Sequence, residues 1–249
     1  QSSDEWFRPV ALRTGPDGCL YIVDWYNKII SHNEVPRNHP DRDKKRGRIW
    51  RVKQTEVKPP EVPDFTKLTG EQLLGKLGGA SIAQSHLAWQ AITDRQMKEL
   101  IPKLKKLVAD TKQTPAKRIA SLWALEGLRA VGCVTLKPLL ADANRNIRRE
   151  ALRAHRDAAL PLGESLAAFG QLLDDSDPEV RAELIRTVGT MLSQNLESGK
   201  SAVSSPTAMK AVELLARSSR GPLSGPTMKS TSNGRTIKAG EAYEREFER

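Results

Sequence analysis

The residues best suited to chemistry lie close together near the start of the chain, between Asp24 and Arg48. Carboxylate and amide oxygens are the ligands that hard cations prefer, so this stretch predicts a Ca²⁺ site. A histidine there can act as a general base, and a guanidinium can hold a carboxylate with two parallel hydrogen bonds. The predicted metal ligands are Asp24, Asn27 and Asp43, the predicted catalytic base is His32, and the predicted cofactor-binding residues are Arg42 and Arg48.

Five of these six residues also have a structural interpretation that the sequence leaves open. Asp24 can cap the turn that follows its strand, and Asn27 can bind a carbonyl of the next loop. Arg42 and Asp43 can form an ion pair with each other. His32 can be an ordinary surface residue or a hydrogen-bonded loop residue.

Three short strands must position these side chains. Residues 7–13 alternate apolar and polar side chains, residues 19–24 are an apolar run, and residues 47–52 alternate strictly. Gly15–Gly18 is a turn sequence between the first two strands. A three-stranded sheet has two open edges and buries too little apolar area to fold alone. Because the blades of a β-propeller stack face to face, residues 1–53 are predicted to be the last blade of a truncated propeller.

Helices follow the strands. Residues 54–66 are a proline-rich linker, and residues 67–219 are predicted to be helical and repetitive. Three helix ends are alike, and their last aspartates, Asp110, Asp142 and Asp175, are spaced by 32 and 33 residues. A period in the low thirties with two helices per repeat predicts an α-solenoid of HEAT-like repeats. The predicted fold class is therefore mostly α, and the alternative is an irregular helical bundle.

An arginine recurs near the start of successive repeats, at Arg118, Arg148 and Arg181. The stretch Asp177–Arg181 resembles the opening of a HEAT repeat, where such an arginine pairs with acidic groups of the next repeat and stabilises the stack. The other interpretation is a ladder of arginines that binds an acidic partner.

The net charge and the composition bear on which kinds of partner the chain can bind. The chain has a formal net charge of +10, and residues 37–53 alone carry +6. This segment is either a solvated loop or an anion-binding surface. Nucleic acid is not favoured, because no RNA- or DNA-reading motif is present and aromatic residues make up only 5% of the chain. No apolar run is long enough to span a membrane. Residues 220–249 are predicted to be a Ser/Gly/Pro-rich loop and the start of a truncated helix.

The strand residues carry a resemblance to a known family. Trp6–Val10, Gly15–Asn27 and Gly47–Arg51 resemble the last blade of bacterial propeller proteins that are labelled membrane-bound dehydrogenases and are similar to quinoprotein sugar dehydrogenases. In that family HEAT-like repeats follow the propeller, often with a c-type cytochrome and its CxxCH motif after them. The order of blade, linker and helical repeats is the same here, whereas the CxxCH motif is missing.

The resemblance implies that the chain is a fragment of an exported, quinoprotein-like dehydrogenase that oxidises sugars or alcohols in the periplasm or at the cell surface. The intact propeller would bind pyrroloquinoline quinone (PQQ) and Ca²⁺, and a missing module would bind haem c. His32 would then remove a proton from a sugar hydroxyl, while Arg42 and Arg48 would hold the carboxylates of the quinone. The helical repeats would be the scaffold between the propeller and the cytochrome module.

The fragment itself is expected to hold no cofactor and to be inactive, because one blade cannot enclose a quinone. Its expected partners are the missing blades and the cytochrome module of the same parent chain. The alternative function is a non-catalytic propeller and HEAT scaffold that binds a protein or a polysaccharide.

Overall fold

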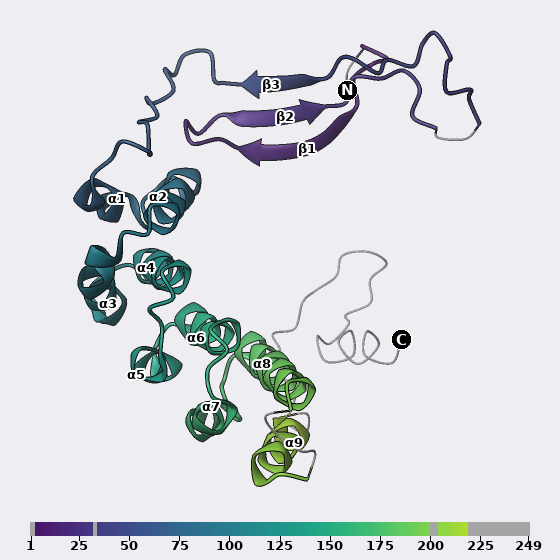
Figure 1. Ribbon diagram of the computed structural model, residues 1–249. Coiled ribbons are helices and arrows are strands. Elements are labelled where there is room, and N and C mark those ends of the chain that lie inside the picture. Colours follow the sequence, from purple (N-terminus) through teal and green to yellow (C-terminus); the bar gives the residue numbers. More distant parts are fainter. Residues whose placement is uncertain (1–2, 32–33, 200–203, 219–249) are drawn as a thin grey trace, which may run out of the picture. The chain divides into compact units, whose positions relative to one another are not determined.

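The computed structural model describes residues 3–31, 34–199 and 204–218 (Figure 1). This part of the chain forms nine α-helices and one three-stranded antiparallel sheet, which confirms the predicted mostly-α fold with a short β segment. The chain divides into two compact units, Gln1–Arg95 and Gln96–Arg249. No described helix combines the length and the apolar composition that a membrane span requires. The predicted truncated helix, in residues 220–249, lies outside the described residues.

The sheet of the first unit contains β1 (Pro9–Thr14), β2 (Leu20–Asp24) and β3 (Arg48–Val52), in the order β1-β2-β3. All three predicted strands are thus present. The turn between β1 and β2 is closed by a hydrogen bond of 3.0 Å from the N–H of Gly18 to the carbonyl of Gly15. Gly18 has a φ of 76°, in the left-handed region that glycine adopts without strain.

Both faces of the sheet carry exposed apolar side chains. Leu12, Ile22 and Trp50 lie opposite one another across the three strands and so share one face. On this face Leu12 is 53% exposed and Trp50 is 44% exposed, while Ile49 on the other face is 70% exposed. The sheet therefore leaves much of its apolar surface uncovered within its own unit.

Two helices complete the first unit. Thr69 and Gln72 form a capping box at the start of α1 (Gly70–Lys76), and Ser81 caps α2 (Ile82–Asp94). The side chain of Gln84 in α2 donates a hydrogen bond of 2.9 Å to the carbonyl of Pro16, in the β1–β2 turn. The predicted linker, residues 54–66, lies within this unit and contains no helix or strand.

The second unit is entirely helical in its described part. Its longer elements form two layers in Figure 1, with α4, α6 and α8 in one layer and α3, α5, α7 and α9 in the other. Successive helices of the first layer pack on each other, as do α7 and α9 in the second. The bounds are α3 (Ile101–Ala109, preceded by the 3₁₀ turn η1, Lys98–Leu100), α4 (Pro115–Gly127), α5 (Cys133–Leu136, continued by η2, Lys137–Ala141), α6 (Arg145–Asp157), α7 (Leu162–Phe169, continued by η3, Gly170–Leu172), α8 (Pro178–Glu197) and α9 (Pro206–Ser218).

The three long helices of the first layer begin at equivalent polar caps. The side chains of Thr114, Asn144 and Asp177 accept hydrogen bonds from backbone N–H groups of the first turns of α4, α6 and α8. Pro115 and Pro178 occupy the first helical position, where no N–H partner is needed. Asp177 and Pro178, which open the stretch that resembles the start of a HEAT repeat, therefore cap and begin a helix.

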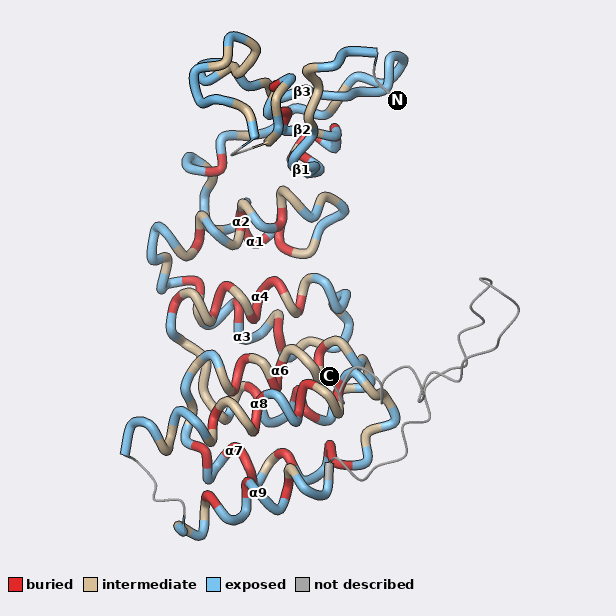
Figure 2. The backbone as a smooth tube through the Cα atoms, turned by 90° about the vertical axis from the view of Figure 1, so that its right-hand side faces the viewer, coloured by how far each residue is buried: buried red, intermediate tan, exposed pale blue. Residues whose placement is uncertain are grey.

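The apolar core of the second unit lies between its two layers. Buried residues, red in Figure 2, recur along α4, α6 and α8. Each amphipathic helix buries one stripe of its surface against the other layer, which stabilises the stack by the hydrophobic effect. The largest fully buried side chains include Leu104, Leu122, Leu125, Leu136, Leu140, Leu152, Leu166, Phe169 and Leu184.

Candidate functional site

Asp24, a predicted metal ligand, ends β2 and is 1% exposed. Its carboxylate accepts three hydrogen bonds of 2.8 Å, from the N–H of Arg8, the N–H of Tyr26 and the indole of Trp50. Burial alone would raise the pKa of Asp24, but these donors, Trp50 foremost, lower it. The ionised carboxylate therefore ties the turn to the residue before β1 and to β3, as the capping interpretation predicts.

Asn27 and Asp43 join the two ends of the loop that connects β2 to β3. The amide of Asn27 donates a hydrogen bond of 2.7 Å to the carbonyl of Asp43, which confirms that Asn27 binds a loop carbonyl. The Asp43 carboxylate accepts the N–H groups of Lys45 and Arg46, and Arg46 Nε lies 2.7 Å from Asp43 Oδ2. These contacts, the Lys45 N–H foremost, lower the pKa of Asp43.

Arg42 holds the loop through carbonyl groups. Its guanidinium donates hydrogen bonds of 2.8 and 3.1 Å to the carbonyls of Ser31 and Val35. The ion pair between Arg42 and Asp43, which the sequence left open as an alternative, is not formed, because Asp43 pairs instead with Arg46. The reversal of the loop brings Arg42 against backbone carbonyls 7 and 11 residues before it in the sequence.

Arg48 lies in an aromatic stack at the same end of the sheet. Its guanidinium carbon is 3.1 Å from the centre of the Tyr26 ring, and the Trp6 ring stacks on Tyr26 at 5.7 Å. Tyr26 has a φ of 48°, a backbone conformation that is uncommon for aromatic residues. The turn capped by Asp24 thus positions the Tyr26 ring against the arginine.

Among the predicted site residues, the oxygen-bearing side chains and the arginines differ in how well they fit a cofactor. Asp24, Asn27 and Asp43 direct their oxygens at protein donors, and the described residues contain no group of three or more His, Cys, Asp or Glu side chains that could hold a metal ion. The Ca²⁺ site of an intact propeller stays a prediction. By contrast, Arg42 Nε and Arg48 Nη1 are buried donors without an acceptor in the described part of the chain. His32 lies outside the described residues.

The recurring arginines of the helical unit form a regular ladder. Arg118 lies 2.7 Å from the carboxylate of Asp142, and Arg148 binds that of Asp175 with two hydrogen bonds of 2.7 Å. Arg148 and Arg181 also donate to the backbone carbonyls of Asp142 and Asp175, so each aspartate receives two arginines. Arg118 and Arg148 therefore pair with acidic groups that follow them in the chain, as the sequence predicts.

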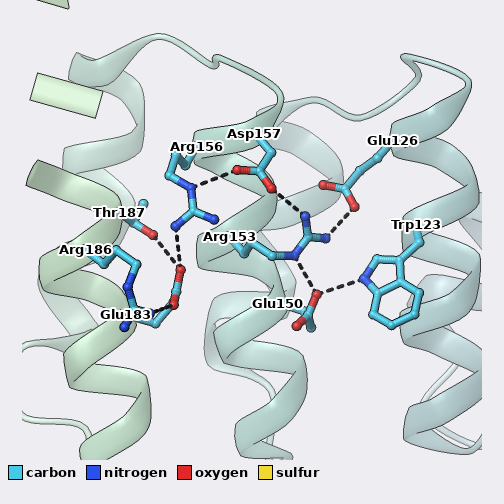
Figure 3. A network of polar contacts seen from close by, with 9 residues as sticks. All are labelled: Trp123, Glu126, Glu150, Arg153, Arg156, Asp157, Glu183, Arg186 and Thr187. Atoms are coloured by element: carbon cyan, nitrogen blue, oxygen red, sulfur yellow. Dashed lines mark hydrogen bonds and ion pairs between the residues drawn. The ribbon is translucent and has the colours of Figure 1, made fainter. Parts of the chain in front are cut away.

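A second polar network runs across α4, α6 and α8 (Figure 3). Arg153 binds Glu150 and Asp157 of its own helix at 2.8 and 2.7 Å, and reaches Glu126 on α4. Burial raises the pKa of Glu126, despite the nearby Arg153. Arg156 donates a hydrogen bond of 2.9 Å to Glu183 on α8, as Figure 3 shows.

This second network was missed at the level of the sequence. Its pairs between helices are an acid and an arginine spaced by 27 residues, Glu126 with Arg153 and Arg156 with Glu183, and the ladder pair of Arg148 and Asp175 has the same spacing. The spacing is shorter than the period of 32 to 33 residues that the terminal aspartates indicate. The helix packing has to be known before such a spacing can be recognised.

Comparison with known proteins adds one finding for the sheet. Residues 1–56 match a family described as a domain of unknown function, DUF7133. The match covers the three strands and the polar loop, which together are less than a quarter of the 249 residues. No curated protein matches the chain.

Proposed function

We propose that this chain is a non-catalytic binding scaffold, in which an α-solenoid of HEAT-like repeats follows the terminal blade of a β-propeller. The observation that carries the proposal is the bonding of the predicted site residues. Asp24, Asn27 and Asp43 use their polar groups to hold the strand ends and the loop together. Side chains that are committed in this way stabilise a surface and leave little to perform catalysis.

The proposal of a solenoid is supported by features that recur from one helix of the second unit to the next. The two layers, the matching caps of α4, α6 and α8, and the arginine ladder all recur along the second unit. A stack of this kind has an extended surface whose shape is fixed by contacts between neighbouring helices. The blade part is supported by the apolar side chains that the sheet leaves exposed, since further blades of a parent protein would cover them.

A second candidate function is favoured by the two unpaired arginine donors. Arg42 Nε and Arg48 Nη1 suit a ligand that carries carboxylates, as PQQ does. PQQ, when bound, would supply the acceptor for a hydride from a sugar or an alcohol. Under this candidate the chain is part of an exported dehydrogenase, in the periplasm or at the cell surface, with Ca²⁺ in the propeller and haem c in a partner module.

Equilibrium dialysis of the full-length gene product against PQQ, with and without Ca²⁺, separates the two candidates, because one blade alone cannot enclose a quinone. The scaffold proposal expects no saturable uptake of PQQ, in the unmodified protein or in its Arg48→Gln variant. Saturable, Ca²⁺-dependent uptake that Arg48→Gln abolishes would overturn it in favour of the dehydrogenase. Arg46→Gln is the matched control, because Arg46 lies in the same loop, is exposed and pairs with Asp43.

A further inference from the structure

Arginines and lysines are distributed differently in the helical unit. The arginines of α4, α6 and α8 are engaged with carboxylates or carbonyls of the protein, as the ladder and the network show. Five exposed lysines behave in the opposite way, because their side chains form no hydrogen bond or ion pair with any residue that the structure describes. We call them the lysine surface, which consists of Lys98, Lys105, Lys106, Lys112 and Lys137.

The lysine surface belongs to the layer that contains α3 and α5. Leu104 and Val108 of α3 are 0% and 2% exposed, because α3 packs against α4 through them. The intervening Lys105 and Lys106 therefore point to solvent. Lys98 and Lys112 flank α3, and Lys137 begins the 3₁₀ turn that follows α5 in the same layer (Figure 1).

Little negative charge accompanies these lysines. Between Gln96 and Gln113 there are four lysines of this surface together with Lys103, and only Glu99 and Asp110 are acidic. The Asp110 carboxylate binds Gln113 and the N–H of Lys112, and its pKa is lowered by these bonds and by the neighbouring lysines. Like charges on neighbouring residues, such as Lys105 and Lys106, repel each other, and an acidic ligand relieves that repulsion.

We propose that the lysine surface docks an acidic polypeptide segment, rich in aspartate and glutamate. This inference rests on the proposed scaffold function and names the chemistry of its partner. Ammonium groups are compact, strongly hydrated point charges, so they suit a salt-sensitive contact with flexible carboxylates. The arginine ladder does not suit such a partner, because its guanidinium groups already bind Asp142 and Asp175.

A polypeptide is favoured over the two other classes of anionic partner. Single-stranded nucleic acids are bound by aromatic side chains on which the bases stack, and η1, α3 and η2 contain no aromatic residue. Membrane binding needs large apolar side chains beside the lysines, whereas the other exposed residues of α3 are Pro102 and Ala109. Val134 on α5 is exposed, but it is a single residue.

The test is fluorescence anisotropy of a labelled glutamate-rich peptide, titrated with the full chain at about 50 and about 200 mM salt. We expect saturable binding that weakens as salt rises. We expect Lys105→Glu with Lys106→Glu to weaken binding roughly tenfold or more at low salt. The matched control is Lys210→Glu with Arg217→Glu on α9, which makes the same change of net charge and should leave binding nearly unchanged. Circular dichroism verifies the fold of both variants.

Three outcomes would overturn the inference. They are absence of peptide binding at low salt, equal weakening by the two double variants, and tighter binding to duplex DNA or to phosphatidylserine vesicles than to the peptide. The second outcome would mean that net charge alone drives the contact. Each of these leaves the PQQ dialysis result untouched, so this inference and the proposed function fail independently.

Discussion

Asp17 joins the β1–β2 turn to the third strand. Its carboxylate is 6% exposed and accepts hydrogen bonds from the N–H of Cys19, the hydroxyl of Tyr21 and the guanidinium of Arg51, at 3.1, 3.0 and 2.8 Å. Burial alone would raise the pKa of Asp17, but these donors lower it to about 2. The Tyr21 ring that reaches Asp17 crosses directly over Gly15.

Gly15→Ala should therefore destabilise the sheet. A Cβ at position 15 would overlap the Tyr21 ring, so the turn or the tyrosine has to move and the contact with Asp17 is strained. Thermal unfolding should show a lower melting temperature for this variant. Gly75→Ala in α1 is the control, because its Cβ would meet nothing within 4 Å and alanine favours a helix by roughly 0.5–1 kcal/mol. Equal melting temperatures for the two variants would contradict the expected clash.

His155 makes the helical unit sensitive to acid. Its ring is 1% exposed, lies edge-on to Phe169 at 5.1 Å and hydrogen-bonds Ser165 at 3.1 Å. Burial lowers the pKa of His155 to about 4 from its usual 6.5. The folded state thus keeps the ring neutral while the unfolded state takes up a proton, so stability is lost as pH falls from 6.5 towards 4.

Denaturant unfolding at several pH values should show this loss. Between about pH 7 and pH 4, His155 should lower the free energy of unfolding by on the order of 3 kcal/mol, and His155→Gln should remove that slope. Glutamine keeps a hydrogen-bonding group near Ser165 but does not titrate. His86→Gln, at an exposed position on α2, should leave the slope in place. A slope that survives His155→Gln would assign the acid sensitivity to other groups.

At the scale of elements, the arginine ladder should account for much of the coupling between neighbouring helices. Arg148→Ala leaves the Asp175 side chain, which is 6% exposed, without its bidentate partner, and should lower the free energy of unfolding by about 3 kcal/mol. Arg149→Ala, one residue along α6, removes a surface pair with Glu179 and should cost about 0.5 kcal/mol. Urea unfolding measures both, and similar losses would mean that burial does not distinguish the two pairs.

The sequence predicts those elements whose signals are local. Strand alternation, the cap at Asp177 and the recurrence of Arg118, Arg148 and Arg181 can all be recognised without a structure. The partner of Arg42 could not be predicted, because the path of a loop decides which carbonyls reach it. The pairing of Arg153 with Glu126 depends on the level at which two helices meet, which periodicity does not specify.

At the scale of the whole molecule, the two units differ in how well they bury apolar side chains. The second unit has a continuous leucine core between two layers, whereas the sheet of the first unit leaves both faces exposed. The first unit should therefore unfold at a lower temperature than the second. Tryptophan fluorescence reports mainly on the first unit, because it contains four of the five tryptophans, Trp6, Trp25, Trp50 and Trp89, and the second unit contains only Trp123. Circular dichroism at 222 nm reports mainly on the second unit, because most of the described helices belong to it.

We expect the fluorescence transition to precede the circular dichroism transition on heating. Coincident transitions would mean that the two units unfold as one. Adding the expected acidic peptide gives an internal check, since a ligand of α3 should delay only the later transition.

The double use of each aspartate in the arginine ladder has an evolutionary consequence. Asp142 and Asp175 each take one arginine on the carboxylate and the next on the carbonyl, so a duplicated segment would bring its own arginine and offer its own aspartate. The gene could gain or lose whole segments of this kind while each arginine–aspartate junction is kept. A deletion of one residue inside a helix would misalign two junctions at once. Related proteins should therefore differ in the number of such duplicated segments much more readily than in the length of each segment.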